Sequence, residues 1–156
     1  MAGRSRAVRQ KGNRMKDLSL FLKKNKIKKE NAFYPAASDL KDENGEVLLW
    51  EIKALSTKEV DELRIACTKE VPINAAKGLY RTVFDNRFGA KLCAAAVVYP
   101  DLYNAELQDS YGVKSPEELL LQMIDNPGEF NAFAEFVREH SGIKNGLAES
   151  VQEAKN

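Results

Sequence analysis

The side chains that most often carry chemistry are sparse in this sequence. It contains one histidine, His140, and two cysteines, Cys67 and Cys93. The cysteines do not have the spacing of a metal site or a redox motif, and each lies in an apolar helical pattern in which cysteine behaves as a small hydrophobic residue. His140 falls in the last turn of an expected helix, where a cation or a donor to free carbonyls is common. All three residues are therefore expected to be structural.

Acidic residues gather around one expected turn, at Asp39, Asp42, Glu43 and Glu46. They lack the alternating ligands of a calcium loop, and acids in turns are usually solvated. Glu51 and Asp109 could act as an acid and a base only if the fold brought them together, and nothing in the sequence does so. The sequence also lacks a phosphate-binding glycine loop and a nucleophile elbow. It therefore predicts no catalytic residue, no metal site and no cofactor, and an enzyme is the least favoured class.

Charge is segregated along the chain although the formal net charge is only +1. Residues 1–29 contain eleven lysines and arginines and one acid, a net charge of +10. The rest of the chain contains thirteen bases and 22 acids, a net charge of −9. Residues 1–14 have few apolar side chains with which to offset the entropy of ordering, so a disordered basic leader is expected there.

The length of 156 residues is sufficient for one domain with a modest core, expected over residues 15–156. No apolar run approaches the length of a membrane-spanning helix, because the longest run, Leu92 to Tyr99, stops at Pro100. The basic N-terminal segment has no apolar stretch behind it and is not a secretory signal. These features predict a soluble protein in a reducing cytoplasm, without membrane contact.

The N-terminal part of this domain predicts a short helix and a β-hairpin. Asp17 is a suitable N-cap for a short apolar helix through Leu22. An extended stretch begins near residue 32, and residues near Trp50 alternate between apolar and polar side chains. Asn44-Gly45 between these stretches is a strong hairpin signal because both residues tolerate the positive φ of a type I′ turn. The expected hairpin spans about residues 32–55.

Helices are expected over about residues 56–154. Ser56 and Glu59 form a capping-box pattern that predicts a helix to about residue 70, ended by Val71-Pro72. Residues 73–84 have no clear period and are expected to form a loop or a poorly ordered excursion. Asp85 is expected to cap a helix that runs to Tyr99 and whose apolar second half would lie at the centre of the domain.

The last helices are indicated by their capping residues. Asn104 is a suitable N-cap for a helix that Gly112 ends in the left-handed conformation. Ser115-Pro116 starts the next helix. A further helix is expected over 129–140, where apolar residues have the spacing of one helical face. Residues 147–154 are also expected to be helical, although this segment is only weakly apolar. The predicted fold class is thus α+β and predominantly α-helical, with an N-terminal β-hairpin packed on a bundle of about five to six short helices.

Several motifs, in this order, resemble the XkdN-like phage tail assembly chaperones. They are LSLFLKKNKIKKENAFYPAAS, LLWEIKALSTKE, LRIACTKEVP and KLCAAAVVYPDLYNAELQDSYGV, followed by SPEELL and NPGEF. The resemblance covers about residues 17–156. It implies a scaffold in the cytoplasm of the bacterial host that binds the long tape measure protein, keeps it soluble, helps to present it to the tail tube protein and then leaves the particle. It implies no catalytic residue.

Two hypotheses about partners follow from the residues themselves. Two of the last helices carry more apolar side chains than one core face needs, so a patch for the client or for self-association is predicted at Leu121, Phe130, Phe133 and Phe136; simple core packing is the alternative. The basic N-terminal segment could instead make this a small nucleic-acid-binding accessory protein. That function is disfavoured because aromatic residues are not interleaved with the lysines and the acidic remainder would repel a polyanion.

Overall fold

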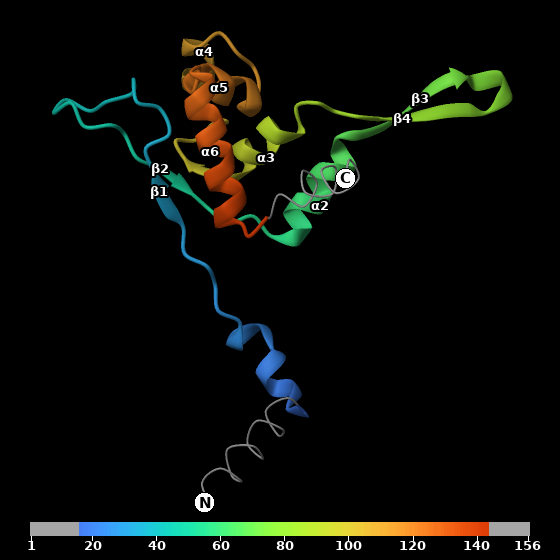
Figure 1. Ribbon diagram of the computed structural model, residues 1–156, viewed down its shortest axis with the longest axis horizontal. Helices are drawn as coiled ribbons and strands as arrows, with labels where there is room; N and C mark the ends of the chain where they lie inside the picture. The colour runs from blue at the N-terminus through green and yellow to red at the C-terminus, as the bar shows by residue number, and fades with distance from the viewer. Residues whose placement is uncertain (1–15, 144–156) are drawn as a thin grey trace, which may run out of the picture.

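The computed structural model describes residues 16–143 (Figure 1). The leader expected over 1–14 and the helix expected over 147–154 lie outside the described residues. Within them the α-helices are α2 (Thr57–Ala66), α3 (Phe88–Ala96), α4 (Ala105–Ser110), α5 (Pro116–Met123) and α6 (Pro127–His140). The strands are β1 (Ala32–Tyr34), β2 (Trp50–Ile52), β3 (Thr68–Asn74), β4 (Leu79–Phe84) and β5 (Val97–Tyr99). Short 3-10 turns are η1 (Leu18–Phe21), η2 (Lys23–Asn25) and η3 (Ala75–Lys77).

The predicted fold class is wrong, because the strands form two separate sheets rather than one N-terminal hairpin. One sheet has three strands in the order β1-β2-β5, and the other is the two-stranded pair β3-β4. Figure 1 shows three parts: a body that contains the helices and the first sheet, a two-stranded ribbon that extends from it, and a segment that leads away toward the N terminus. The ribbon, the N-terminal segment and the loop between β1 and β2 therefore extend from the body (Figure 1).

The three-stranded sheet begins with the antiparallel pairing of β1 and β2 that the hairpin prediction required. The turn between them lies at Asn44-Gly45, as expected, but it is not of type I′, because Gly45 has a φ of +81° while no residue other than glycine among residues 16–143 has a positive φ. The Asp42 carboxylate accepts from the backbone N–H groups of Asn44 and Glu46 at 2.8 and 3.0 Å. Asp42, one of the acids grouped around the expected turn, therefore stabilises the turn itself.

The third strand of this sheet differs from the prediction. Residues 97–99 were expected to continue the helix, but α3 ends at Ala96 and Val97–Tyr99 pair antiparallel with β2. Two adjacent β-branched residues, Val97 and Val98, favour a strand, and Pro100 disfavours the helical conformation for the residue before it. The sheet pairing adds hydrogen bonds that a longer helix would forgo.

The helix α3 forms the centre of the body, and this part of the prediction is confirmed. Five of its residues are buried: Ala90, Leu92, Cys93, Ala94 and Ala96. It contacts α2, α5 and α6. The core also takes in the inner face of the sheet through Trp50 and Ile52, and no polar or charged side chain is buried among residues 16–143.

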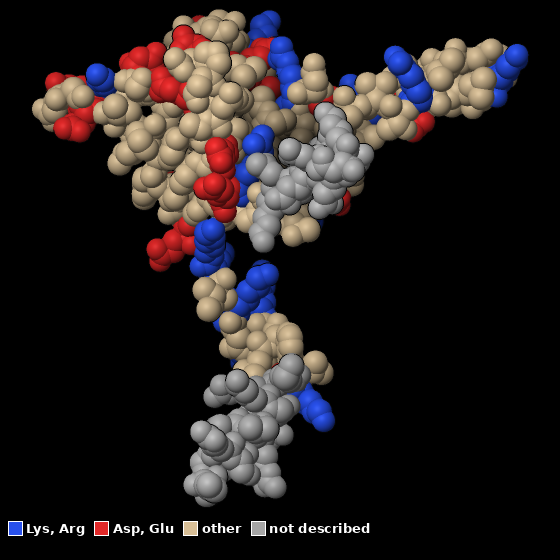
Figure 2. Space-filling view, viewed as in Figure 1, with Lys and Arg blue, Asp and Glu red and all other residues tan. Residues whose placement is uncertain are grey.

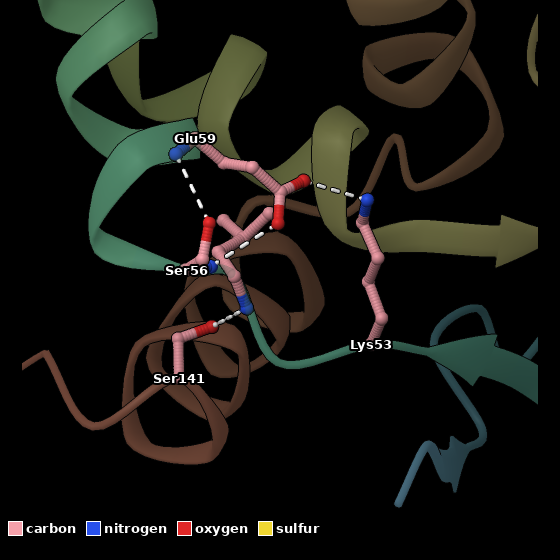
Figure 3. Close-up of polar contacts among 5 residues, drawn as sticks. Lys53, Ser56, Glu59 and Ser141 are labelled. Carbon is pink, nitrogen blue, oxygen red and sulfur yellow. Dashed lines mark hydrogen bonds and ion pairs between the residues drawn. The ribbon is translucent and has the colours of Figure 1, made fainter. Parts of the chain in front are cut away.

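Helix starts follow the capping signals in the sequence. The Ser56 hydroxyl accepts from the Glu59 N–H at 3.1 Å while the Glu59 carboxylate accepts from the Ser56 N–H at 3.2 Å, which confirms the capping box at α2 (Figure 3). Asn104 and Ser115 cap α4 and α5 in the same way, each by accepting a backbone N–H three residues on. At α3 the N-cap is Arg87 rather than the expected Asp85, although the Asp85 carboxylate accepts from the Arg87 N–H at 2.9 Å.

A small polar cluster joins α2 to the sheet and to the end of α6 (Figure 3). Lys53, one residue after β2, donates to Glu59 at 2.7 Å. The Ser141 hydroxyl accepts from the Leu55 N–H at 2.8 Å. The hydrogen bond from Lys53 is the largest cause of the lowered pKa of Glu59. These bonds fix the beginning of α2, which itself has no buried residue, against the body.

The stretch from Tyr99 to Val113 is a corner of the fold. Leu102 is buried in the core, and the side-chain amide of Gln108 donates to the Leu102 carbonyl at 2.8 Å. Gly112 closes α4 with a φ of +67°, in the left-handed region where a side chain is disfavoured. The tyrosines and acids of this stretch therefore surround a change of chain direction.

Candidate partner-binding surfaces

The antiparallel pair of β3 and β4, called the ribbon, is exposed along nearly its whole length. Residues 73–84 were predicted to be a loop, and α2 was predicted to run to residue 70; both predictions are wrong, because 68–74 and 79–84 pair antiparallel around a turn that Gly78 closes in the left-handed region. Apart from the half-buried Val71, all residues of the two strands are exposed. Its large exposed apolar side chains are Ile73, Leu79, Tyr80, Val83 and Phe84.

Apolar side chains occupy both faces of this ribbon. Directly paired residues of an antiparallel pair share a face, and the face alternates from one pair to the next. Pro72 pairs with Tyr80, so both lie on one face, while Lys69 and Val83, the pair three places along, lie on the other. A two-stranded sheet without packing is marginally stable in water. Both of its faces are thus available for a partner that covers them.

The base of the ribbon is held firmly by the body. The Asp85 N–H donates to the Cys67 carbonyl at 2.8 Å, which closes the ladder below the last strand pair. The ring of Phe84 contacts that of Phe88 at the start of α3, with centroids 5.1 Å apart. Lys91 of α3 forms an ion pair with Asp85 at 2.9 Å. The direction in which the ribbon projects is therefore set by α3.

A second exposed surface is the N-terminal arm, defined as residues 16–29. The Asp17 carboxylate caps η1 as predicted, by accepting from the Ser19 N–H at 3.0 Å, but two 3-10 turns replace the expected short helix. No residue of either turn is buried, and the apolar side chains of the arm are exposed: Leu18, Leu20, Phe21, Leu22 and Ile27. The arm also contains six lysines and one acid. Nucleic-acid binding by these lysines stays a prediction.

The third surface is the outer face of the three-stranded sheet. Phe33 of β1 pairs with Glu51 of β2, and Glu51 pairs with Tyr99 of β5, so the three side chains form a row across the sheet. Phe33 is 63% exposed and Tyr99 is 68% exposed, while Glu51 between them is half-buried. This row, Phe33, Glu51 and Tyr99, is called the sheet-face patch below. Its opposite side carries Trp50 and Ile52 into the core.

The four residues predicted as a partner-binding patch lie on α5 and α6, but not all at the surface. Phe133 is 0% exposed and contacts the rings of Tyr34 and Trp50, with centroids 5.8 and 6.0 Å apart, so it belongs to the core. Leu121, Phe130 and Phe136 are half-buried, and the latter two pack against the core cluster. Partner binding by these three stays a prediction, whereas Phe133 offers no surface in the folded chain.

Sequence reasoning missed the ribbon and the sheet-face patch. A signal for the ribbon was present, because LYRTVF is rich in β-branched and aromatic residues and follows the turn-forming Asn74 and Gly78. The sheet-face patch had no such signal, since its residues come from three separate parts of the chain. Only the pairing of the strands brings them together.

His140 is placed as expected, in the last turn of α6, where its ring stacks on Phe136 with centroids 5.8 Å apart. Desolvation by burial, with a further contribution from the Lys29 charge, lowers the pKa of His140. The Lys29 ammonium donates to the His140 backbone carbonyl, which ties the base of the arm to the end of α6. The histidine is thus part of a structural contact.

The structure does not join the other candidate groups into a site. Glu51 is on β2 and Asp109 is on α4, and no hydrogen bond between them occurs among residues 16–143. No group of three or more histidine, cysteine or acidic residues in the described part of the chain could hold a metal ion. A hollow of about 280 Å³ lies between α2 and residues 141–143 and is lined by Leu55, Val60, Asp61, Arg64 and Ile143 among others. No helix among the described residues has the length and apolar content required to cross a membrane.

Comparison with known proteins gives a consistent result. The family model for phage XkdN-like tail assembly chaperone proteins matches residues 18–155. The chain is 25% identical over 147 residues to the phage-like element PBSX protein XkdN of Bacillus subtilis strain 168, which covers 94% of this chain and 99% of that protein. It is 26% identical over 140 residues to the uncharacterized protein YqbN of the same strain, covering 90% and 93%.

A crystal structure of YqbN is also similar. It superposes with a TM-score of 0.66 at 25% identity, and the match covers 82% of this chain and 98% of that chain. The sequence resemblance is thereby confirmed over nearly the whole length of the chain. The protein belongs to the family of phage XkdN-like tail assembly chaperones.

Proposed function

We propose that this protein binds the tape measure protein of a phage tail, keeps it soluble and assists assembly of the tail tube without remaining in the finished virion. Membership of the tail assembly chaperone family supports a role in tail assembly. The observation that carries the proposed packing role is the ribbon, whose large apolar side chains are exposed while its base is fixed on α3.

The physical reason for such a protein lies in its client. A long, largely helical protein exposes apolar stripes before the tube encloses it, and exposed apolar stripes lead to self-association. The ribbon can lie along a stripe and cover it with the apolar side chains of one face, such as Leu79 and Val83. A single contact made by a few apolar side chains is weak, but repeated contacts along one long client gain avidity.

This action requires no bond to be made or broken. Burial of apolar surface drives it, so the protein acts in the host cytoplasm as a binding protein and not as an enzyme. The tail tube protein is the second proposed partner, because it must displace the chaperone from the client as the tube grows. Release follows if the tube subunits bury more of the apolar stripe than the ribbon does.

Co-expression with the tape measure gene of the same phage tests the proposal. The tape measure protein should move from the pellet to the supernatant when the chaperone is present and should co-purify with it. Replacing two ribbon residues, Leu79→Ser with Tyr80→Ser, should return most of the client to the pellet. Both positions are about half exposed, so the substitutions should leave the body folded.

The matched control is Ile65→Ser, an apolar residue on α2 that is 67% exposed. It should leave the client soluble. A ribbon variant that is folded and solubilises the client as well as the unaltered protein would remove the ribbon from the proposal. A tape measure protein that stays insoluble with the unaltered chaperone would overturn the function itself.

A further inference from the structure

We infer that the sheet-face patch is a binding site for the N-terminal arm of a second copy of this chain, so that copies associate arm to sheet. The inference is independent of the client and would stand if the tape measure protein were not the partner. It starts from the chemistry of Phe33, Glu51 and Tyr99.

The patch has the composition of a cation-binding slot. Glu51 is the central residue of the row and is flanked on either strand by an exposed aromatic ring. Neighbouring strands are about 4.8 Å apart, so Phe33 and Tyr99 lie about 10 Å from each other across the sheet, with Glu51 on the strand between them. A cation that binds the Glu51 carboxylate is therefore also close to two aromatic rings.

The Glu51 carboxylate has acceptor capacity left for such a cation. Its hydrogen bond in the structure comes from the Asn31 amide at 3.4 Å, which is long. A carboxylate accepts several hydrogen bonds, and a lysine ammonium donates three. Glu51 is also half-buried, where an ion pair is screened less than at a fully exposed position.

The arm carries the complementary groups. Residues 16–29 have a net charge of +5, from six lysines and Asp17. Lys26 and Lys28 flank Ile27, which is 93% exposed, so cations alternate with an apolar side chain that can pack on the rings. The body, residues 30–67 and 85–143, contains nineteen acids and eight bases, a net charge of −11. Figure 2 shows acidic side chains over the body and basic side chains on the arm and the ribbon.

The geometry of the arm favours a second copy over its own sheet. The arm runs away from the body in Figure 1. Lys29 lies at the end of the arm, four residues before Phe33. Its ammonium group donates to the backbone carbonyl of His140. Folding the arm back onto its own patch would require either that this contact breaks or that the chain reverses direction within the few residues before Lys29. An arm of another copy approaches the patch without that cost.

The contact joins two different surfaces, so it is a head-to-tail contact. Each copy offers one arm and one patch, and such a contact produces either a closed ring or a growing chain of copies. Either arrangement presents the ribbons at regular intervals. The association is electrostatic in part and therefore depends on salt.

Sedimentation velocity of the full chain gives the first test. At about 50 mM salt the mass should exceed that of one chain and increase with protein concentration, and at about 500 mM salt it should fall toward one chain. Glu51→Lys should weaken the association at least about tenfold. Glu106→Lys, a matched reversal of an exposed acid on α4, should leave it unchanged.

Mixing two variants tests the pairing directly. The first is Glu51→Lys, which has a basic patch and a basic arm. The second carries Lys24→Glu, Lys26→Glu and Lys28→Glu, which gives an acidic arm and an intact patch. Each alone should be monomeric, and a mixture should form complexes with equal amounts of both, because each arm then meets a patch of opposite charge. Circular dichroism melts establish that both variants fold.

Three outcomes would overturn the inference. The unaltered chain could stay monomeric at all concentrations, which would mean that the patch takes its own arm or a different protein. Glu51→Lys could associate as strongly as the unaltered chain. The two variants, both folded, could fail to associate when mixed.

Discussion

The carboxylate of Glu129 accepts two hydrogen bonds from Ser38, one from the backbone N–H and one from the hydroxyl, each 2.8 Å long. The two residues are 91 positions apart in sequence. Glu129 lies in the first turn of α6, and Ser38 lies in the segment that follows β1. The pair fixes the start of α6 against the chain next to the sheet, and thereby sets the position of Phe133 one turn further along the helix.

Glu129→Gln should lower the free energy of unfolding by about 1 kcal/mol. The substitution weakens two charge-assisted hydrogen bonds and removes a negative charge from a helix N-terminus, and the exposure of Ser38 reduces the loss. Urea unfolding followed by the fluorescence of Trp50, the single tryptophan, measures it. The control Glu135→Gln changes an exposed acid of the same helix and should cost less than about 0.5 kcal/mol. Equal losses for both variants would contradict the assigned role of the Ser38 contact.

Ser56→Ala should destabilise the protein by about 1 kcal/mol, because α2 then loses the acceptor for its Glu59 N–H. The same unfolding experiment detects the change. Thr57→Ala, at the neighbouring exposed position inside the helix, serves as control and should have an effect within about 0.5 kcal/mol. If the two alanine variants are equally stable, the capping box contributes nothing measurable.

The ion pair between Lys53 and Glu59 predicts a pH dependence. The folded pKa of Glu59 is lowered, chiefly by the hydrogen bond from Lys53, so this group stabilises the fold above its ordinary carboxyl pKa and the contribution is lost as pH falls through the folded pKa. Stability should therefore decrease from about pH 5 to about pH 3, and Glu59→Gln should flatten part of that decrease. Unfolding midpoints across this range measure it. A variant whose pH profile has the same shape as that of the unaltered chain would show that Glu59 does not contribute.

Both cysteines should be unreactive in the native protein. Cys67 and Cys93 are each 1% exposed, and burial raises the pKa of the Cys93 thiol to about 11. The thiolate is the reactive form, so raising the pH to about 9 should leave the Cys93 thiol protonated and unreactive. Titration with a chromogenic disulfide reagent should find no rapidly reacting thiol in native buffer and two rapidly reacting thiols in denaturant. A fast native reaction would mean that α3 or the start of the ribbon opens readily.

Phe133 and Phe33 provide a matched pair that separates core from surface. Phe133→Ala should cost about 3 to 5 kcal/mol because it leaves a cavity among Tyr34, Trp50 and the α6 core face. Phe33→Ala, at a position 63% exposed, should change the free energy of unfolding by less than about 0.5 kcal/mol. Thermal and chemical unfolding report both values. A small loss at Phe133 would restore it as a surface candidate.

Local signals in the sequence predicted the helix starts well. The capping patterns at Ser56, Asn104 and Ser115 involve residues three positions apart, and those contacts form in the structure as expected. Asn44-Gly45 likewise lies in its turn. Such features depend on a few neighbouring residues and need no knowledge of the rest of the fold.

The ribbon and the third strand were not predicted in this way, although the composition of LYRTVF favours a strand. Val71 and Pro72 looked like the end of a helix, yet they pair with Arg81 and Tyr80 in a strand whose faces both carry apolar side chains, so neither a helical nor an alternating period is clear. Tyr99 follows an apolar run that also suits a helix, and only pairing with Glu51 decides its conformation.

The predicted partner patch was limited by the same difficulty. Phe133 and Phe136 are close on one helix and have similar side chains, but the first is enclosed by Tyr34 and Trp50 while the second is half-buried. Which face of a helix meets the core depends on elements nearly one hundred residues away. The arm and the outer face of the sheet are candidate surfaces because the folded body leaves both of them exposed, and this depends on the whole fold.

The long sequence separation of the central contacts affects when the protein can act during its synthesis. The sheet needs residues 97–99 beside β2, and Leu55 is tied to Ser141, so the body closes only after residue 141 has left the ribosome. The lysine-rich segment before β1 emerges far earlier. A nascent chain therefore displays that segment while its own sheet is still incomplete.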